Sequence, residues 1–136
     1  MLHAKKTGLA SKRYEITRDG QPLTVVEARS GGQFQLGGTG YRLGTRQLLA
    51  ADGSVLARAT RPGRREWSVE SGGEVLRFRR TGRRDHARID EAGNTIGTVS
   101  ARAADLPGVE PELQVFVLAL LVMRARRRRV VVVAGS

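Results

Sequence analysis

Arginines gathered at two turn signals are the residues whose type and spacing best suit chemistry. One group surrounds the dipeptide Pro62-Gly63, and the other surrounds Gly82. The planar guanidinium group donates paired hydrogen bonds that match a phosphate or a carboxylate. If the two turns lie at the same end of a sheet, their arginines form a single anion-binding rim. The candidate anion-binding or lipid-binding residues are Arg61, Arg64, Arg65, Arg79, Arg80, Arg83 and Arg84.

The net charge of +11 over 136 residues allows two interpretations. A strongly basic chain is typical of proteins that bind nucleic acid or an anionic membrane surface. However, only three of the 24 basic residues are lysines (Lys5, Lys6 and Lys12), and such an excess of arginine is typical of a GC-rich genome. The arginines therefore also fit an ordinary solvated surface whose charge is incidental to function.

Residues for enzymatic chemistry are scarce. The chain has no cysteine, which excludes disulfides, thiolate metal sites and a cysteine nucleophile. His86 directly follows Asp85, and adjacent residues of a strand point to opposite faces, so the two do not form a catalytic pair. We expect His86 to be a surface histidine. His3 lies in the polar N-terminal segment, so a metal site shared with His86 is not expected.

The glycine-rich segment 37–40 is similar to a phosphate-binding loop but lacks its full pattern. Leu43 stands where G-x-G-x-x-G requires its third glycine, and no helix pattern follows. The nucleophile elbow G-x-S-x-G and the phosphate-loop pattern G-x-x-x-x-G-K-[ST] do not occur. The sequence therefore predicts a glycine-rich hairpin here, and a protein that is not an enzyme and holds no cofactor or metal.

Turn signals about ten residues apart predict short antiparallel strands joined by hairpins. Between the turns apolar residues alternate with polar ones, as Trp67 and Val69 do with their neighbours, which indicates strands with one packed face. Trp67 is expected to anchor the core and not to stack a ligand. The predicted strands cover residues 12–18, 22–29, 33–36, 41–50, 54–61, 65–70, 74–80, 85–90 and 95–101.

A helix is predicted over about 110–127. Pro111 suits its first turn, and the nine residues from Val115 to Met123 are apolar on all sides. These nine residues span about 14 Å, too little to cross a bilayer. Such a helix is expected inside an antiparallel sheet curled into a closed or nearly closed β-barrel, the alternative being a hairpin buried in a membrane or another subunit. The arginines between 124 and 129 are expected to face the negative end of the helix dipole.

The length of the chain suits one domain. We expect a flexible N-terminus over about 1–11, strands over about 12–101, the buried helix and a short tail over 128–136. The β-prone run Val130–Val133 in that tail is expected either to add a last strand or to stay frayed. Residues 1–13 lack the apolar run of a secretion signal, which favours a cytoplasmic location, peripheral at the membrane if lipid is the ligand.

The order of these elements resembles the tubby C-terminal-like superfamily, which includes the phospholipid scramblases and the LURP-one-related proteins. The resemblance rests on the hairpin Asp52-Gly-Ser-Val-Leu-Ala-Arg-Ala, the strand Arg65-Glu-Trp-Ser-Val, the hairpin Arg88-Ile-Asp-Glu-Ala-Gly-Asn-Thr-Ile-Gly-Thr-Val and the apolar C-terminal helix. It covers about residues 12–127. It implies a barrel of about twelve strands wrapped around a hydrophobic helix.

The resemblance implies a function in binding, because the family carries no established enzyme chemistry. Tubby-like domains recognise phosphoinositide headgroups through basic residues, and their scramblase relatives act at membranes. The implied ligand is therefore an anionic phospholipid headgroup or membrane surface. A calcium-dependent activity is not expected, because no loop rich in Asp and Glu occurs. Two alternatives stay open: charge-driven nucleic-acid binding, and a structural or protein-interaction domain with an incidental basic surface. The sequence also leaves the oligomeric state open.

Overall fold

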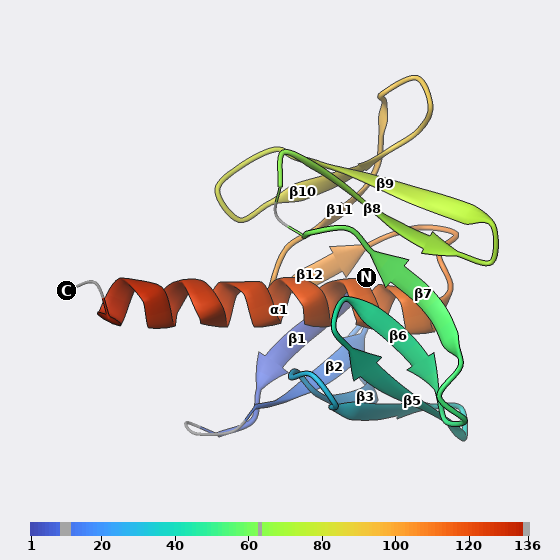
Figure 1. The fold of residues 1–136 in the computed structure, drawn as a ribbon, viewed down its shortest axis with the longest axis vertical. Coiled ribbons are helices and arrows are strands. Elements are labelled where there is room, and N and C mark those ends of the chain that lie inside the picture. Colours follow the sequence, from blue (N-terminus) through green and yellow to red (C-terminus); the bar gives the residue numbers. More distant parts are fainter. Residues whose placement is uncertain (9–11, 63, 135–136) are drawn as a thin grey trace.

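Twelve antiparallel strands form one sheet that curls around a single C-terminal helix (Figure 1). The computed structural model describes residues 1–8, 12–62 and 64–134, with side chains through Arg127. The strands are β1 (Leu2–Lys6), β2 (Arg13–Arg18), β3 (Gln21–Glu27), β4 (Gln33–Leu36), β5 (Thr39–Gly44), β6 (Gln47–Ala50), β7 (Val55–Ala59), β8 (Glu66–Ser71), β9 (Glu74–Arg80), β10 (His86–Ile89), β11 (Thr95–Val99) and β12 (Ala103–Asp105), and the helix is α1 (Pro111–Ala134).

The sheet is an up-and-down meander that curls back so that its two edges meet. β1 pairs with β12, and the two edge strands are β3 and β4. Thr24 Oγ1 of β3 donates a 2.6 Å hydrogen bond to the Gln35 carbonyl of β4 across this seam. The chain passes from β3 to β4 through Gly32, where any side chain would collide with the Glu27 carbonyl oxygen. The result is a nearly closed antiparallel barrel, which confirms the predicted fold class.

The core lies between the inner face of the barrel and α1. Trp67 of β8 stacks on Phe78 of β9 at a ring-centroid distance of 4.3 Å, and both side chains are buried, which confirms Trp67 as a core residue. Residues 115–122 of α1 are each at most 4% exposed. Because strands surround the helix, it has no solvent-facing stripe in this stretch. The predicted burial of the helix is confirmed.

The N-terminal segment is a strand of the barrel, so the expectation of a flexible N-terminus is wrong for residues 2–6. β1 lies between β2 and β12. Leu2 and Ala4 pack against the core, whereas His3 and Lys5 are exposed. Because the strand has only two apolar residues, its polar composition hides the alternation. The predicted segment also includes residues 9–11, which lie outside the described part of the chain.

The predicted strand 41–50 is in fact two strands, β5 and β6. Thr45 and Arg46 form the turn between them, and Arg46 adopts a φ of +55°, which is uncommon outside glycine. The only typical turn residue there is Gly44, which pairs with Gln47 across the turn, and a single glycine is also compatible with one continuous strand. The short strand β12, which follows the last predicted strand, was also missed.

The helix continues further than predicted. α1 ends at Ala134 and not near residue 127, so Val130–Val133 lies in helical backbone and not in a last strand or a tail. The last two residues of the chain lie outside the described part. Across the residues that the structure describes, no helix has the length and apolar character needed to span a bilayer.

Candidate anion-binding end of the barrel

Successive turns of an up-and-down sheet alternate between its two ends, and here this alternation separates charge. One end holds the turns 28–32, 45–46, 81–85 and 100–102 and the described parts of the connections 7–12 and 60–65. These six turns carry nine Lys or Arg residues and a single acid, Asp85. Backbone hydrogen bonds tie this end together, among them one from Ala28 N to Lys12 O. We call it the basic end.

The opposite end has the reverse composition. It holds the turns 19–20, 37–38, 51–54, 72–73 and 90–94 and the connection 106–110 between β12 and α1. These segments carry five acids and no Lys or Arg in the sequence. We call it the acidic end. Sequence reasoning missed this polarity: acidic or glycine-only turns alternate with basic ones, but assigning each turn to an end requires every strand, and the division between β5 and β6 was not predicted.

The two predicted arginine turns meet at the basic end. β8 and β9 pair with Glu66 opposite Arg79, so the residue before β8 lies beside the residue that ends β9. The Arg80 amide accordingly donates a 2.9 Å hydrogen bond to the Arg65 carbonyl. The predicted convergence of the two turns is therefore confirmed.

Five of the seven candidate arginines lie in these turns with exposed side chains, and we call them the basic rim: Arg61, Arg64, Arg65, Arg83 and Arg84. None of the five side chains has a hydrogen-bond or ion-pair partner among the described residues. The backbone beneath Arg83 and Arg84 is held in place, since Thr81 and Gly82 both donate their amides to the Asp85 carbonyl. Guanidinium groups that the described chain leaves unpaired suit a ligand that carries its own negative charge.

The other two candidate arginines have partners. Arg79 lies on the outer wall of the barrel, where its Nε is 3.7 Å from Glu66 Oε1. Arg80 binds the backbone of the turn that follows it: Nε donates to the Gly82 carbonyl at 3.1 Å and Nη2 to the Arg83 carbonyl at 3.5 Å. Arg80 therefore shapes the turn that presents Arg83, and Arg79 lies outside the rim.

The C-terminal part of α1 emerges at the basic end, on the side of the β9–β10 turn (Figure 1). Arg126 Nη1 donates a 2.7 Å hydrogen bond to the Ala28 carbonyl, just after β3. Arg124 lies close enough to His86 for its charge to act on the imidazole. The expected position of this arginine cluster at the end of the helix is wrong, because α1 continues to Ala134. Arg126 instead fastens the helix to the barrel wall.

His86 is buried at 2% exposure, so the expectation of a surface histidine is wrong. It lies opposite Arg80, on the inner face that also carries Phe78, and its Nδ1 accepts a 3.1 Å hydrogen bond from Trp67 Nε1. A buried indole N–H needs an acceptor, and His86 supplies it. Burial, and then the charges of Arg124 and Arg80, lower the pKa of His86 to about 4. The imidazole is therefore neutral near pH 7 and serves as a core hydrogen-bond acceptor.

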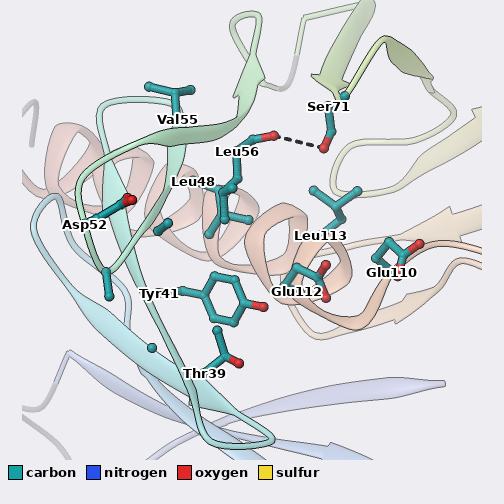
Figure 2. Close-up of a pocket in the computed structure, with 14 residues that line it drawn as sticks. Thr39, Tyr41, Leu48, Asp52, Val55, Leu56, Ser71, Glu110, Glu112 and Leu113 are labelled. Atoms are coloured by element: carbon teal, nitrogen blue, oxygen red, sulfur yellow. Dashed lines mark hydrogen bonds between the residues drawn. The ribbon is translucent and has the colours of Figure 1, made fainter.

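The acidic end contains a pocket of about 770 Å³ beside the first turn of α1 (Figure 2). The Tyr41 hydroxyl points toward Glu112 in this view. Burial and the charge of Glu112 both raise the pKa of Tyr41, so the phenol stays protonated. The sequence analysis did not single out this pocket. Its carboxylates are Asp52, Glu110 and Glu112, and its larger apolar residues are Leu48, Val55, Leu56 and Leu113.

Neither metal-binding groups among the described residues nor similar known proteins point to a further function. Within the described residues, no three His, Asp or Glu side chains come together as a possible metal-binding cluster. Comparison of the chain with protein-family models, with curated proteins and with solved structures found no match. The candidate site therefore rests on geometry and charge.

Proposed function

We propose that the protein is a non-enzymatic, tubby-like barrel domain that binds anionic phospholipid surfaces through its basic end. The observation that carries the proposal is the basic rim, five exposed arginines that have no partner among the described residues and lie on two joined turns. The proposed likeness to tubby-like domains is argued from the twelve strands around an enclosed C-terminal helix, which is the arrangement that the sequence resemblance implies.

Electrostatics favours a flat anionic partner over a small one. A basic residue close to an anionic membrane contributes about 1 kcal/mol, and the five rim arginines belong to an end whose turns carry nine basic residues. The acidic end is repelled by the same surface. The protein is therefore expected to approach with its barrel axis along the membrane normal and the basic end first.

Nucleic acid is the competing anionic partner. Binding to single strands uses exposed aromatic side chains as stacking platforms. Here Phe34, Trp67, Phe78 and Phe116 are buried, and the two tyrosines are partly buried. Phosphate contacts to a duplex need no aromatic residue, so duplex DNA belongs in the test beside lipid.

The test compares two variants with the same net charge. The rim variant carries Gln at Arg64, Arg65, Arg83 and Arg84, and the wall variant carries Gln at four exposed strand arginines, Arg18, Arg42, Arg58 and Arg77. In sedimentation with vesicles of anionic phospholipid, we expect the rim variant to lose at least about tenfold in affinity and the wall variant less than about threefold. The wild type should not bind neutral vesicles.

Two further measurements vary the salt concentration and compare vesicles with duplex DNA. Binding of the wild type should weaken steeply from low to physiological salt, because exposed charges are screened beyond about 8–10 Å. Equal losses in the two variants would overturn the proposal, since they would indicate a diffuse positive surface. Equal binding of the wild type to duplex DNA and to vesicles at matched charge density would overturn its lipid component.

A further inference from the structure

We propose that the acidic-end pocket is a docking site for a short basic segment of a partner protein. Arginine or lysine side chains of that segment enter the pocket, and its apolar residues cover the wall of the barrel beside it. The pocket lies at the end opposite the basic rim, so this inference does not depend on lipid binding.

The pocket exists because β7 and β8 separate toward the acidic end. β8 and β9 pair at six positions, whereas β7 and β8 pair at only two, both far from that end. Beyond them a side chain replaces the strand pairing: Ser71 Oγ donates a 2.9 Å hydrogen bond to the Leu56 carbonyl (Figure 2). Both residues line the pocket, and Glu112 and Leu113 of α1 lie across from them. The hollow of about 770 Å³ is therefore built into the barrel wall.

The pocket carries negative charge that the described chain does not neutralise. Asp52, Glu110 and Glu112 line it, and no described Lys or Arg does. The ion pairs within the described chain use other carboxylates. Glu112 also favours the helix dipole from the first turn of α1, yet its charge reaches the pocket, since burial and then this charge raise the pKa of Tyr41. A cationic side chain entering here meets carboxylates beside an aromatic ring, a combination that attracts arginine and lysine.

Exposed apolar side chains gather at the same end. Val55 and Leu56 line the pocket although they are 40% and 37% exposed. Val75 of β9 is 55% exposed and lies outside the pocket lining. Of the six large apolar residues that are exposed in the described chain, five lie at or next to the acidic-end start of a strand: Met1, Val55, Leu56, Val75 and Ile96.

The position of Val75 favours a chain segment over a free amine. β9 is the second strand from β7, and neighbouring strands are about 4.8 Å apart, so Val75 lies about 10 Å or more from the β7 wall of the pocket. A small cation that fills the pocket leaves Val75 in water. An extended peptide covers about 10 Å in three residues, so one segment reaches both.

Charge selects the chemistry of that segment. The segments of the acidic end carry five acids and no Lys or Arg in the sequence, so they attract a basic partner and repel an acidic one. Apolar contact with Val55, Leu56 and Val75 adds a favourable contribution that salt does not screen. The alternative occupants are a free amine and the basic end of a second copy of this chain.

The experiment is a titration of the isotope-labelled, full-length protein at low salt with the peptide acetyl-Arg-Arg-Gly-Leu-Leu-amide, followed by amide NMR. We expect the signals of Gly40, Gly72 and Leu113 at the pocket to shift, and those of Thr81 and Gly82 at the basic end to stay. The peptide with Glu in place of Arg should leave the pocket signals unmoved. The peptide with Ser in place of Leu should bind at least about threefold more weakly. The free cation, represented by N-acetylarginine amide, should bind more weakly than either basic peptide.

Matched variants test the two halves of the site. The pocket variant carries Glu110→Gln and Glu112→Gln, and its control carries Glu91→Gln and Asp105→Asn, two exposed acids outside the pocket lining. We expect the pocket variant to lose at least about fivefold in affinity for the basic peptide and the control less than about twofold.

The apolar half is tested by Val75→Ser, which should weaken binding about threefold, whereas Val25→Ser, at an exposed valine of β3, should not change it. Circular dichroism should show that all variants are folded.

Four results would overturn the proposal: pocket signals that stay unmoved up to millimolar peptide, equal losses in the pocket variant and its control, N-acetylarginine amide binding as tightly as the peptide, or wild-type oligomers that the pocket variant abolishes. The third result would assign the pocket to a free amine, and the fourth would assign it to a second copy of this chain. The pocket variant keeps the basic rim, so it should bind anionic vesicles as the wild type does. Failure of docking is thereby separated from failure of lipid binding.

Discussion

The two ends of the barrel are built from the same element, the turn between antiparallel strands, yet they use their charged residues differently. At the acidic end the aspartates hold turns: Asp52 Oδ1 accepts hydrogen bonds from Ser54 N and Oγ at 2.9 and 2.7 Å. Asp90 Oδ1 likewise accepts from Asn94 N at 2.8 Å, and Asp19 pairs with the N-terminal amine at 3.1 Å. At the basic end the side chains of the rim arginines make no hydrogen bond or ion pair within the described chain.

This difference separates a structural charge from a functional one. The aspartates sit in turns because a short carboxylate accepts the backbone N–H groups that a tight turn leaves free. Folding alone explains them. The fold gives no such reason for Arg64, Arg65, Arg83 or Arg84, and a side chain without a structural role is the better guide to binding.

Both ends of the barrel are built around α1, so disrupting this helix should have the largest effect on the stability of the domain. Leu118 is fully buried, and an unpaired carboxylate there costs several kcal/mol. We expect Leu118→Asp to unfold the domain, measured by circular dichroism and thermal melting. Leu118→Met, which keeps the apolar volume, should cost less than about 1.5 kcal/mol. A folded monomeric Leu118→Asp protein would show that the helix is not the core.

As the pH falls, stabilising interactions near the basic end should be lost before those at the acidic end. His86 has a folded pKa of about 4, below its ordinary value of 6.5, so the stability that it contributes is complete above pH 6.5 and is lost as the pH falls toward 4. The expected loss is about 3 kcal/mol. The pKa values of Asp52 and Asp90 are lowered below 3.8 by their turn hydrogen bonds, so the stability linked to them is lost only at lower pH.

Trp67 makes this titration measurable, because it is the only tryptophan and bonds directly to His86. Denaturant unfolding followed by its fluorescence should give a falling free energy of unfolding between pH 6.5 and 4. His86→Gln, whose amide oxygen can accept the indole N–H and does not titrate, should flatten this dependence. An unchanged pH profile in His86→Gln would contradict the assignment.

The smallest expected effects compare one turn residue from each end. Asp90→Ala removes the acceptor of the Ala92 and Asn94 amides and should lower the melting temperature. Arg84→Ala removes a side chain that has no partner in the described part of the chain and should leave the melting temperature unchanged within error. Equal destabilisation by the two changes would show that the rim arginines also have a structural role.

Much of the fold was predictable from the sequence because it follows from periodicity. Strands with one packed face, and a helix that is apolar on all sides, require a sheet curled around that helix. The convergence of the two arginine turns was predictable for the same reason: they are separated by two strands, so they fall at the same end.

The polarity of the whole molecule was not predictable, because it depends on counting every strand. If 41–50 is taken as one strand, the Arg46 turn is lost. Every turn before it is then assigned to the wrong end of the barrel. The residue with the left-handed φ is Arg46, and the single Gly44 before it is compatible with a continuous strand, so the turn was missed. His86 was predicted at the surface because polar side chains usually face solvent. Its burial is explained by the hydrogen bond from the indole N–H of Trp67, which lies 19 residues away in the sequence.

The measurement that tests the account most directly asks which end faces an anionic membrane. The chain has no cysteine, so Ser30→Cys in a basic-end turn and Ala92→Cys in an acidic-end turn each give a single labelling site on an exposed, uncharged residue. With an environment-sensitive fluorophore and vesicles of anionic phospholipid, the label at residue 30 should shift to the blue and the label at residue 92 should not. Equal shifts at both sites, or a shift at residue 92 alone, would contradict binding through the basic end.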